Sequence, residues 1–195
     1  MKWDYLKLPG ETSTVVDYTW KIIVSGEGGV GKSTLLHRYF YHEFRPDMSM
    51  TVGVSHLSHD IDRNGKLVRL IIWDLGGQKR FDVLHPAYVG DATAGFVFFD
   101  STSLETLENM DKWVDLIRKK NTEDILLVMV GTKIDLILSQ ESLDYVFSLA
   151  EQKMAELNIQ YVTATSSKAN YNVEETINFL IDYLLWRESS AKQQT

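Results

Sequence analysis

The sequence contains no cysteine among its 195 residues, which excludes disulfides, thiolate metal sites and cysteine nucleophiles. The same absence excludes prenylation and palmitoylation, and Lys2 at the second position excludes N-myristoylation. No apolar run reaches the length that spans a bilayer, and residues 1–10 lack the apolar core of a signal peptide. We therefore expect a cytoplasmic protein with no direct lipid anchor, which reaches membranes only through protein partners.

Basic residues are outnumbered, since 20 Lys and Arg stand against 27 Asp and Glu, for a net charge of −7. Binding to nucleic acid regardless of its sequence needs a basic surface, so we expect no nucleic-acid partner. The hydrophobic fraction of 44% and the chain length suit one folded domain. We place that domain at residues 19–187, between an N-terminal extension at 1–18 and a C-terminal tail at 188–195.

Glycine is concentrated in one stretch, residues 26–33, which read Gly-Glu-Gly-Gly-Val-Gly-Lys-Ser. This matches Gly-x-x-x-x-Gly-Lys-Ser, the phosphate-binding loop, and it lies between a strand-like run at 20–24 and a helix-like run at 34–40. Glycines let backbone N–H groups approach a phosphate, and the following helix adds its positive end. Lys32 would reach the terminal phosphates, and the hydroxyl of Ser33 would ligate Mg²⁺. The stretch predicts a nucleotide-binding site.

Strand-like and helix-like segments alternate along the chain, with strands expected at 20–24, 54–62, 66–73, 95–99, 125–130 and 159–162. Asn64-Gly65 predicts a β-hairpin, and the polar character of its first strand places that strand at the sheet edge. This order predicts an α/β fold with a six-stranded, mostly parallel sheet, one antiparallel edge strand and helices on both faces. Ligands of such folds bind at the carboxyl ends of the strands.

The spacing of apolar residues predicts further helices. One opens at residues 102–105, where Thr102 and Glu105 have the spacing of a capping box. Its expected buried stripe consists of Leu104, Leu107, Val114 and Ile117. Another helix is expected over residues 143–157, and a last one begins near Asn172.

Four residues after or between the predicted strands have side chains or backbones suited to a phosphate and its metal. Asp74 follows a buried strand, which is the usual place of a carboxylate that holds Mg²⁺. Gly77 offers a backbone N–H to a γ-phosphate, and Gln78 could orient an attacking water. Thr51 would add a second hydroxyl ligand to Mg²⁺ when its loop closes on the nucleotide. Phe44, in the same loop, is either a core residue or an aromatic cover for a base.

Two short motifs follow the last two predicted strands, Thr132-Lys133-Ile134-Asp135 and Ser166-Ser167-Lys168. The carboxylate of Asp135 can accept from both N1–H and the exocyclic amine of guanine, a donor pair that adenine lacks. The stem of Lys133 can lie along the base, and a backbone N–H in the second motif can donate to guanine O6. The two motifs, at successive strand ends, predict selection of guanine.

The five stretches at 26–33, 51, 74–78, 132–135 and 166–168 resemble the motifs of Ras-superfamily small GTPases, over residues 19 to about 187. Residues 51–54 and 73–74 resemble the Rab branch. Residues 74–78 and 131–133 also resemble the fungal septation-initiation GTPases, and archaeal Ras-like GTPases are a third group that the chain resembles. The resemblance implies the G domain of P-loop NTPases, bound GTP or GDP with Mg²⁺, and slow GTP hydrolysis by a molecular switch.

The resemblance also implies roles for individual residues. It makes Gln78 and Lys32 catalytic, and it makes Ser33, Thr51 and Asp74 ligands of Mg²⁺, the last through water. It implies nucleotide contacts by Glu27, Gly28, Gly29, Val30, Gly31, Lys32, Ser33, Thr34, Phe44, Thr51, Gly77, Thr132, Lys133, Asp135, Ser166, Ser167 and Lys168. The implied partners are a GTPase-activating protein, a nucleotide exchange factor and effectors, which would bind through residues 44–54 and 74–90.

Some residues depart from the family pattern. Thr132 stands where Asn is commoner, Ser167 stands where Ala is commoner, and Glu27 puts a carboxylate inside the phosphate loop. Two other classes stay open: a P-loop kinase or metabolic ATPase, and a module that binds nucleotide without turnover. A preference for guanine over adenine separates a GTPase from a P-loop kinase or ATPase. Hydrolysis in a single-turnover assay separates a GTPase from a binding module. An arginine that assists hydrolysis is either Arg80 or one supplied by the activating protein.

Overall fold

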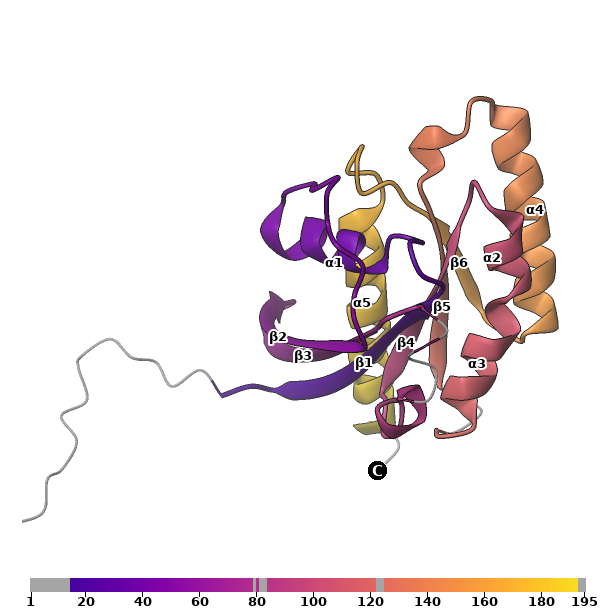
Figure 1. Cartoon of the computed structure of the whole chain (residues 1–195). Coiled ribbons are helices and arrows are strands. Elements are labelled where there is room, and N and C mark those ends of the chain that lie inside the picture. Colours follow the sequence, from indigo (N-terminus) through magenta and orange to yellow (C-terminus); the bar gives the residue numbers. More distant parts are fainter. Residues whose placement is uncertain (1–14, 79, 81–83, 122–124, 193–195) are drawn as a thin grey trace, which may run out of the picture.

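The computed structural model describes residues 15–78, 80, 84–121 and 125–192. Its strands are β1 (Tyr18–Gly26), β2 (Val54–Arg63), β3 (Lys66–Leu75), β4 (Ala94–Asp100), β5 (Leu126–Thr132) and β6 (Tyr161–Ala164). Its α-helices are α1 (Lys32–Tyr41), α2 (Leu104–Glu108), α3 (Met110–Arg118), α4 (Gln140–Glu156) and α5 (Val173–Lys192) (Figure 1). Short 3₁₀ helices, η2 (His85–Ala87) and η3 (Ile134–Leu136), lie in two of the connections.

The strands form one six-stranded sheet in the order β2-β3-β1-β4-β5-β6. The pairs within β3-β1-β4-β5-β6 are parallel, and β2 pairs with β3 in antiparallel register. Asn64 and Gly65 join β2 to β3 with φ values of 53° and 71°, as a tight hairpin turn requires. The fold class and the polar edge strand predicted from the sequence are thus confirmed.

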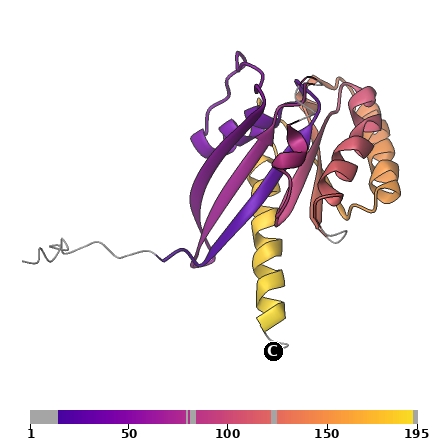
Figure 2. The ribbon, with the colours of Figure 1, turned by 60° about the horizontal axis from the view of Figure 1, so that its bottom comes forward.

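Helices cover both faces of the sheet (Figure 2). One core lies under α1 and α5, where Leu35, Ile177 and Leu184 pack against residues of β1, β3 and β4. The other lies under α2, α3 and α4, where Met110 and Ala150 pack against the opposite face. Every residue of β4 and β5 is buried, because helices cover these central strands on both sides.

The helix predicted from residue 102 differs from expectation. The capping box is wrong, because Ser103 occupies the N-cap position and the hydroxyl of Thr102 donates to Asp100 Oδ1 at 2.7 Å. The segment forms two helices, α2 and α3, that meet at Asn109. Leu104 is 37% exposed and so leaves the predicted buried stripe, whereas the other three residues of that stripe are buried.

The structure describes only parts of the predicted N-terminal extension and C-terminal tail. Residues 1–14 of the predicted extension and 193–195 of the predicted tail lie outside the described residues. Helix α5 continues past residue 187 to Lys192, so the described part of the tail is helical. Among the described residues, none of the helices is long and apolar enough to cross a bilayer.

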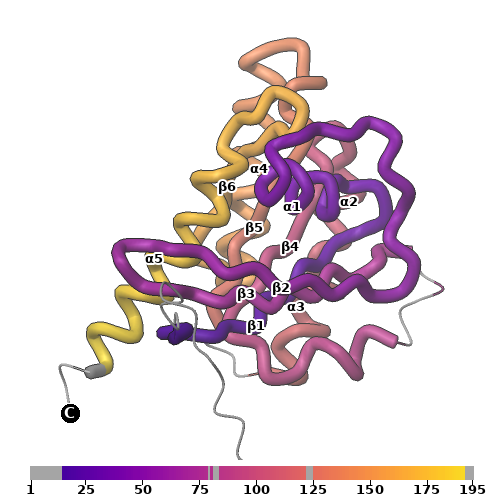
Figure 3. Tube along the Cα trace, turned by 90° about the vertical axis from the view of Figure 1, so that its left-hand side faces the viewer, coloured from indigo at the N-terminus to yellow at the C-terminus, as the bar shows by residue number. Residues whose placement is uncertain are grey.

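The tip of the β2–β3 hairpin lies beside α5 (Figure 3), and an ion pair between Arg63 and Asp182 joins the two. Arg63 donates to both carboxylate oxygens of Asp182, at 2.7 and 2.5 Å. The hydrogen bond from Arg63 lowers the pKa of Asp182 below its ordinary value of 3.8. Both side chains are about a third exposed or more, so the contribution of the pair to stability is small.

We expect a double-mutant cycle with Arg63→Ala and Asp182→Ala to give a coupling of about 0.2–1 kcal/mol at pH 7, measured by chemical denaturation. Since the folded-state pKa of Asp182 is lowered, this stability is present above the ordinary aspartate pKa. It is lost as the pH falls through the lower folded-state value. A coupling that is zero at pH 7, or that grows as the pH is lowered, would contradict this account.

Candidate functional site

A cavity of about 460 Å³ opens at the carboxyl ends of β1, β3, β5 and β6. Most of the site residues predicted from the sequence line it: Gly28, Gly29, Gly31, Lys32, Ser33, Thr34, Phe44, Thr51, Gly77, Gln78, Thr132, Lys133, Asp135, Ser167 and Lys168. Glu27, Val30, Asp74 and Ser166 are not part of this lining, although each contacts a residue that is. Residues from five separate stretches of the sequence thus meet around one space.

The loop between β1 and α1 turns back on itself around Lys32. Gly31, the N-cap of α1, has a φ of 98°, a left-handed conformation that favours glycine. Lys32 is 5% exposed, and its Nζ donates to the carbonyls of Gly26 and Glu27, both at 2.8 Å. Burial lowers the pKa of Lys32 to about 8, while the carboxylates of Asp74 and Glu27 oppose this shift. The lysine is therefore held inside the loop with its charge largely desolvated.

The three side chains predicted to bind a metal contact one another. The hydroxyl of Ser33 donates to Asp74 Oδ2, Thr51 Oγ1 donates to the same oxygen at 3.1 Å, and the two hydroxyls are 2.7 Å apart. Asp74 is 2% exposed, and its Oδ1 is a buried atom with no hydrogen-bond partner among the described residues. Burial raises the pKa of Asp74, against the hydrogen bonds and the charge of Lys32. Two hydroxyls and one carboxylate with a free oxygen suit a small, hard dication such as Mg²⁺.

The segment after β3 packs directly on the loop around Lys32. The N–H of Gly28 donates to the carbonyl of Gly77 at 3.0 Å, and the N–H of Gly76 donates to Gly53 at 2.7 Å. A Cβ at Gly77 would lie 2.1 Å from the carbonyl carbon of Glu27 and 2.2 Å from the nitrogen of Gly28, so no larger residue fits. Three loops that are distant in sequence are therefore joined through their backbones.

Gln78 follows this glycine and is half-buried in the cavity wall. Its Nε2 donates to the sulfur of Met50 at 3.6 Å, which joins the segment after β3 to the loop before β2. The predicted partner surface at 74–90 contains residues 79 and 81–83, which lie outside the described residues. Arg80 is described and exposed.

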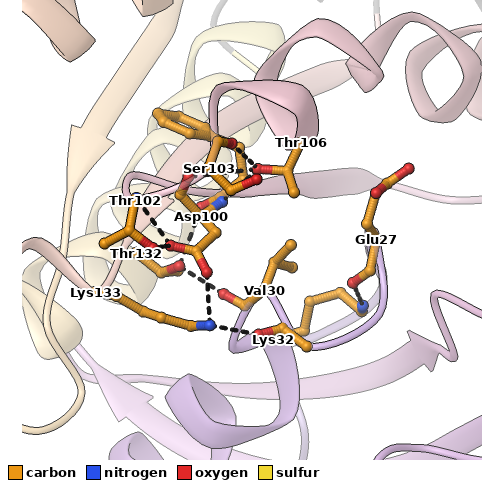
Figure 4. Close-up of polar contacts among 11 residues, drawn as sticks. Glu27, Val30, Lys32, Asp100, Thr102, Ser103, Thr106, Thr132 and Lys133 are labelled. Atoms are coloured by element: carbon orange, nitrogen blue, oxygen red, sulfur yellow. Dashed lines mark hydrogen bonds and ion pairs between the residues drawn. The ribbon is translucent and has the colours of Figure 1, made fainter. Parts of the chain in front are cut away.

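Thr132 and Lys133 connect the end of β5 to the loop between β1 and α1. The hydroxyl of buried Thr132 lies 2.5 Å from the carbonyl of Val30 and 3.0 Å from that of Phe99. Lys133 Nζ contacts the carbonyl of Gly29 at 2.7 Å and Asp100 Oδ2 at 2.6 Å (Figure 4). Both side chains thereby join the end of β5 to this loop.

Asp135 and Ser166 meet across the β5 and β6 ends of the cavity. Ser166 is buried, its Oγ donates to Asp135 Oδ1 at 2.6 Å, and it accepts the backbone N–H of Ala169 at 2.9 Å. The exposed carboxylate of Asp135 is thus oriented by Ser166, which does not line the cavity. Phe44 is half-buried and lines the cavity, a position compatible with its predicted role as a cover.

The structure also brings in residues that the sequence analysis missed. Asp100 ends β4 and is held at the cavity margin by Thr102 and Lys133. It directly follows the strand predicted at 95–99, which is the same signal that identified Asp74. Met48, Met50 and Leu136 add apolar surface to the lining, and no short motif distinguishes them. Glu27 directs its carboxylate to Lys112 of α3, at 2.5 Å, and not into the cavity.

A comparison with known protein families agrees with this arrangement. The model that describes the Ras family matches residues 21–185, and that range contains each loop of the cavity. The match covers well over half of the chain. The chain belongs to the Ras family.

Proposed function

We propose that this protein is a molecular switch that binds GTP or GDP with Mg²⁺ and slowly hydrolyses GTP to GDP and phosphate. The observation that carries the proposal is the meeting of five stretches on one cavity, with a buried lysine, a hydroxyl–carboxylate cluster and an oriented aspartate around it. Membership of the Ras family supports a small GTPase in general terms.

The loop around Lys32 is suited to the phosphates. Lys32 would exchange its bonds to two loop carbonyls for contacts with the terminal phosphates, as a point charge in a desolvated site. Ser33 and Thr51 would ligate Mg²⁺ directly, and Asp74 would hold it through water. When bound, Mg²⁺ neutralises charge on the phosphate oxygens. The unpartnered Oδ1 of Asp74 gives the carboxylate an acceptor for that water.

The other end of the cavity is suited to guanine. The carboxylate of Asp135 would accept from N1–H and the exocyclic amine, and the bond from Ser166 keeps it in place. Lys133 extends from the base end of the cavity to the carbonyl of Gly29, so its stem can lie along the base. A backbone N–H at Ser167 would donate to O6, and Phe44 would cover the base.

Hydrolysis would depend on positioning and on charge. Gln78 would orient the attacking water, and Lys32 would stabilise charge on the transferred phosphoryl group. Ser49 stands where Gα proteins carry an arginine in cis, so the cavity has no such residue at that point. Slow turnover by the isolated protein follows, with stimulation by an activating protein that supplies an arginine.

The partner surface would be the two segments that contact the nucleotide, 44–54 and 74–90. Met50, Val52 and Leu84 are 57%, 69% and 42% exposed in these segments. Large apolar side chains on a surface that changes with the nucleotide suit effectors and regulators that read its state. Residues 44–54 and 74–78 contact each other through Gly53, Gly76, Met50 and Gln78, so both would respond together.

For base choice, we expect GTP and GDP to bind roughly a thousandfold or more tightly than ATP, because adenine lacks the donor pair for Asp135. Asp135→Asn should shift the preference to xanthine nucleotides, whose exocyclic group is an acceptor. A competition titration measures both effects, with Asp144→Asn on the exposed face of α4 as the matched control. Equal affinity for ATP and GTP would point instead to a P-loop kinase or ATPase.

For the phosphate site, Lys32→Ala should weaken GTP binding by about 2–5 kcal/mol, because a charge-assisted contact in a desolvated loop is removed. Isothermal titration measures the loss, and a thermal melt checks that the variant is folded. Lys120→Ala, which removes an exposed lysine, should leave the affinity unchanged. If Lys32→Ala keeps its GTP affinity, the glycine-rich loop is only a turn and does not bind the phosphates.

For hydrolysis, we expect single-turnover rates on the order of 10⁻⁴ to 10⁻² s⁻¹ for the isolated protein. Gln78→Leu should lower this rate and leave GTP affinity intact, since the glutamine would act on the water and not on the nucleotide. Arg80→Ala should leave the rate unchanged if the assisting arginine comes from a partner. An unassisted fast rate that Arg80→Ala abolishes would make the arginine internal, and no hydrolysis at all would favour a binding module.

A further inference from the structure

The second residue of the glycine-rich loop is a glutamate whose backbone and side chain have different partners. The carbonyl of Glu27 accepts from Lys32, so its backbone is part of the loop around the cavity. The side-chain carboxylate leaves the loop and contacts Lys112 of α3, with 2.5 Å between Oε1 and Nζ. Figure 4 shows this carboxylate directed away from Asp100, Thr132 and Lys133. The contact joins residues that are 85 positions apart in the sequence.

Lys112 lies on α3, a helix whose backbone is held in place by the core. Trp113, Val114 and Ile117 are 3%, 1% and 0% exposed in the core, so the helix backbone is well anchored. The ammonium of Lys112 also lies 5.6 Å from the ring centroid of Trp113, a second interaction that restricts its position. The side chain of Glu27 is only 22% exposed, so its charge is incompletely screened by water.

The charge of Glu27 is unfavourable for the proposed ligand. The loop that contains it is the one that would enclose the phosphates, and like charges repel strongly where solvent is partly excluded. Glu27 acts on this site already, since its carboxylate is one of two that favour the charged form of Lys32. A triphosphate carries more negative charge than a diphosphate, so an uncompensated Glu27 would penalise GTP more than GDP.

We propose that Lys112 is a positioning residue of the nucleotide site, which neutralises Glu27 and holds its carboxylate on the α3 side of the loop. Through this contact Lys112 sets the ratio of GTP to GDP affinity without touching the nucleotide. The inference rests on the proposed function, because it takes a nucleoside di- or triphosphate as the ligand of this loop. This role adds α3 to the nucleotide site, although α3 contains none of the five nucleotide-binding motifs.

Lys112→Ala should lower the affinity for GTP roughly threefold to tenfold relative to GDP at low ionic strength. Adding Glu27→Gln to that variant should restore the ratio, because the unpaired charge is gone. Lys112→Arg should keep it, and Lys119→Ala, at the exposed C-terminal end of α3, is the matched control. Competition against a fluorescent GDP analogue with Mg²⁺ measures the ratio at 20 mM and 300 mM salt, and the loss should shrink at the higher value.

Three outcomes would overturn the inference. An unchanged ratio in Lys112→Ala would show that the pair does not act on the site. If Lys112→Ala and the double variant lose the same GTP affinity relative to GDP, the charge of Glu27 does not cause the loss. Lys112 would then have only a structural role. If the unchanged protein binds neither GTP nor GDP, the proposed function fails and this inference fails with it, whereas binding with unresponsive variants overturns the inference alone.

Discussion

The parallel register of β1 between β3 and β4 is the constraint on which the site depends. Val24 pairs with Asp74 across one side of β1, and Gly26 pairs with Phe98 across the other. All three strands therefore end at the same edge of the sheet, and the loops that follow them meet there. Helices on both faces make this register hard to change, because a slip of one residue would exchange the faces of each buried side chain.

The backbone contact between Gly77 and the glycine-rich loop is the second constraint. Gly77 sits against Glu27 and Gly28 with no space for a Cβ, and Gly76 is bonded to Gly53. A ligand that moves one of these loops must therefore displace its neighbours, since backbone hydrogen bonds join them. Such a cluster is suited to report the presence of one phosphate to two surface segments, as the proposed switch requires.

Three charged groups in or beside the cavity lining have partners that lie outside that lining. Lys133 meets Asp100, Asp135 meets Ser166, and Glu27 meets Lys112 on a separate helix. Each partner fixes the direction of its charged group, and Asp100 and Lys112 lie on β4 and α3, which pack into the core. The net charge of −7 is thus compatible with a site for an anionic ligand, because local geometry and not the overall charge decides the field in the cavity.

Much of the fold could be predicted from the sequence because its signals are local. Alternation of strand-like and helix-like runs, the Asn64-Gly65 turn and the polar edge strand each depend on neighbouring residues, and each appears in the structure. Local signals failed at residue 102, where the hydroxyl of Thr102 bonds to Asp100 and leaves the N-cap to Ser103. A capping box competes with any nearby acceptor, and spacing alone does not reveal that acceptor.

The sequence by itself determined which residue types stand at the strand ends, and so predicted the glycine-rich loop, Asp74 and Asp135 as parts of one site. Only the tertiary structure decided which of the predicted site residues line the cavity and which contact the lining residues from outside it. Ser166 became the partner of Asp135, Thr132 the partner of Val30, and Glu27 the partner of a lysine 85 residues away. The physical reason is that a hydrogen bond or ion pair depends on distance and direction in space, and these follow from the packing of whole elements and not from sequence spacing.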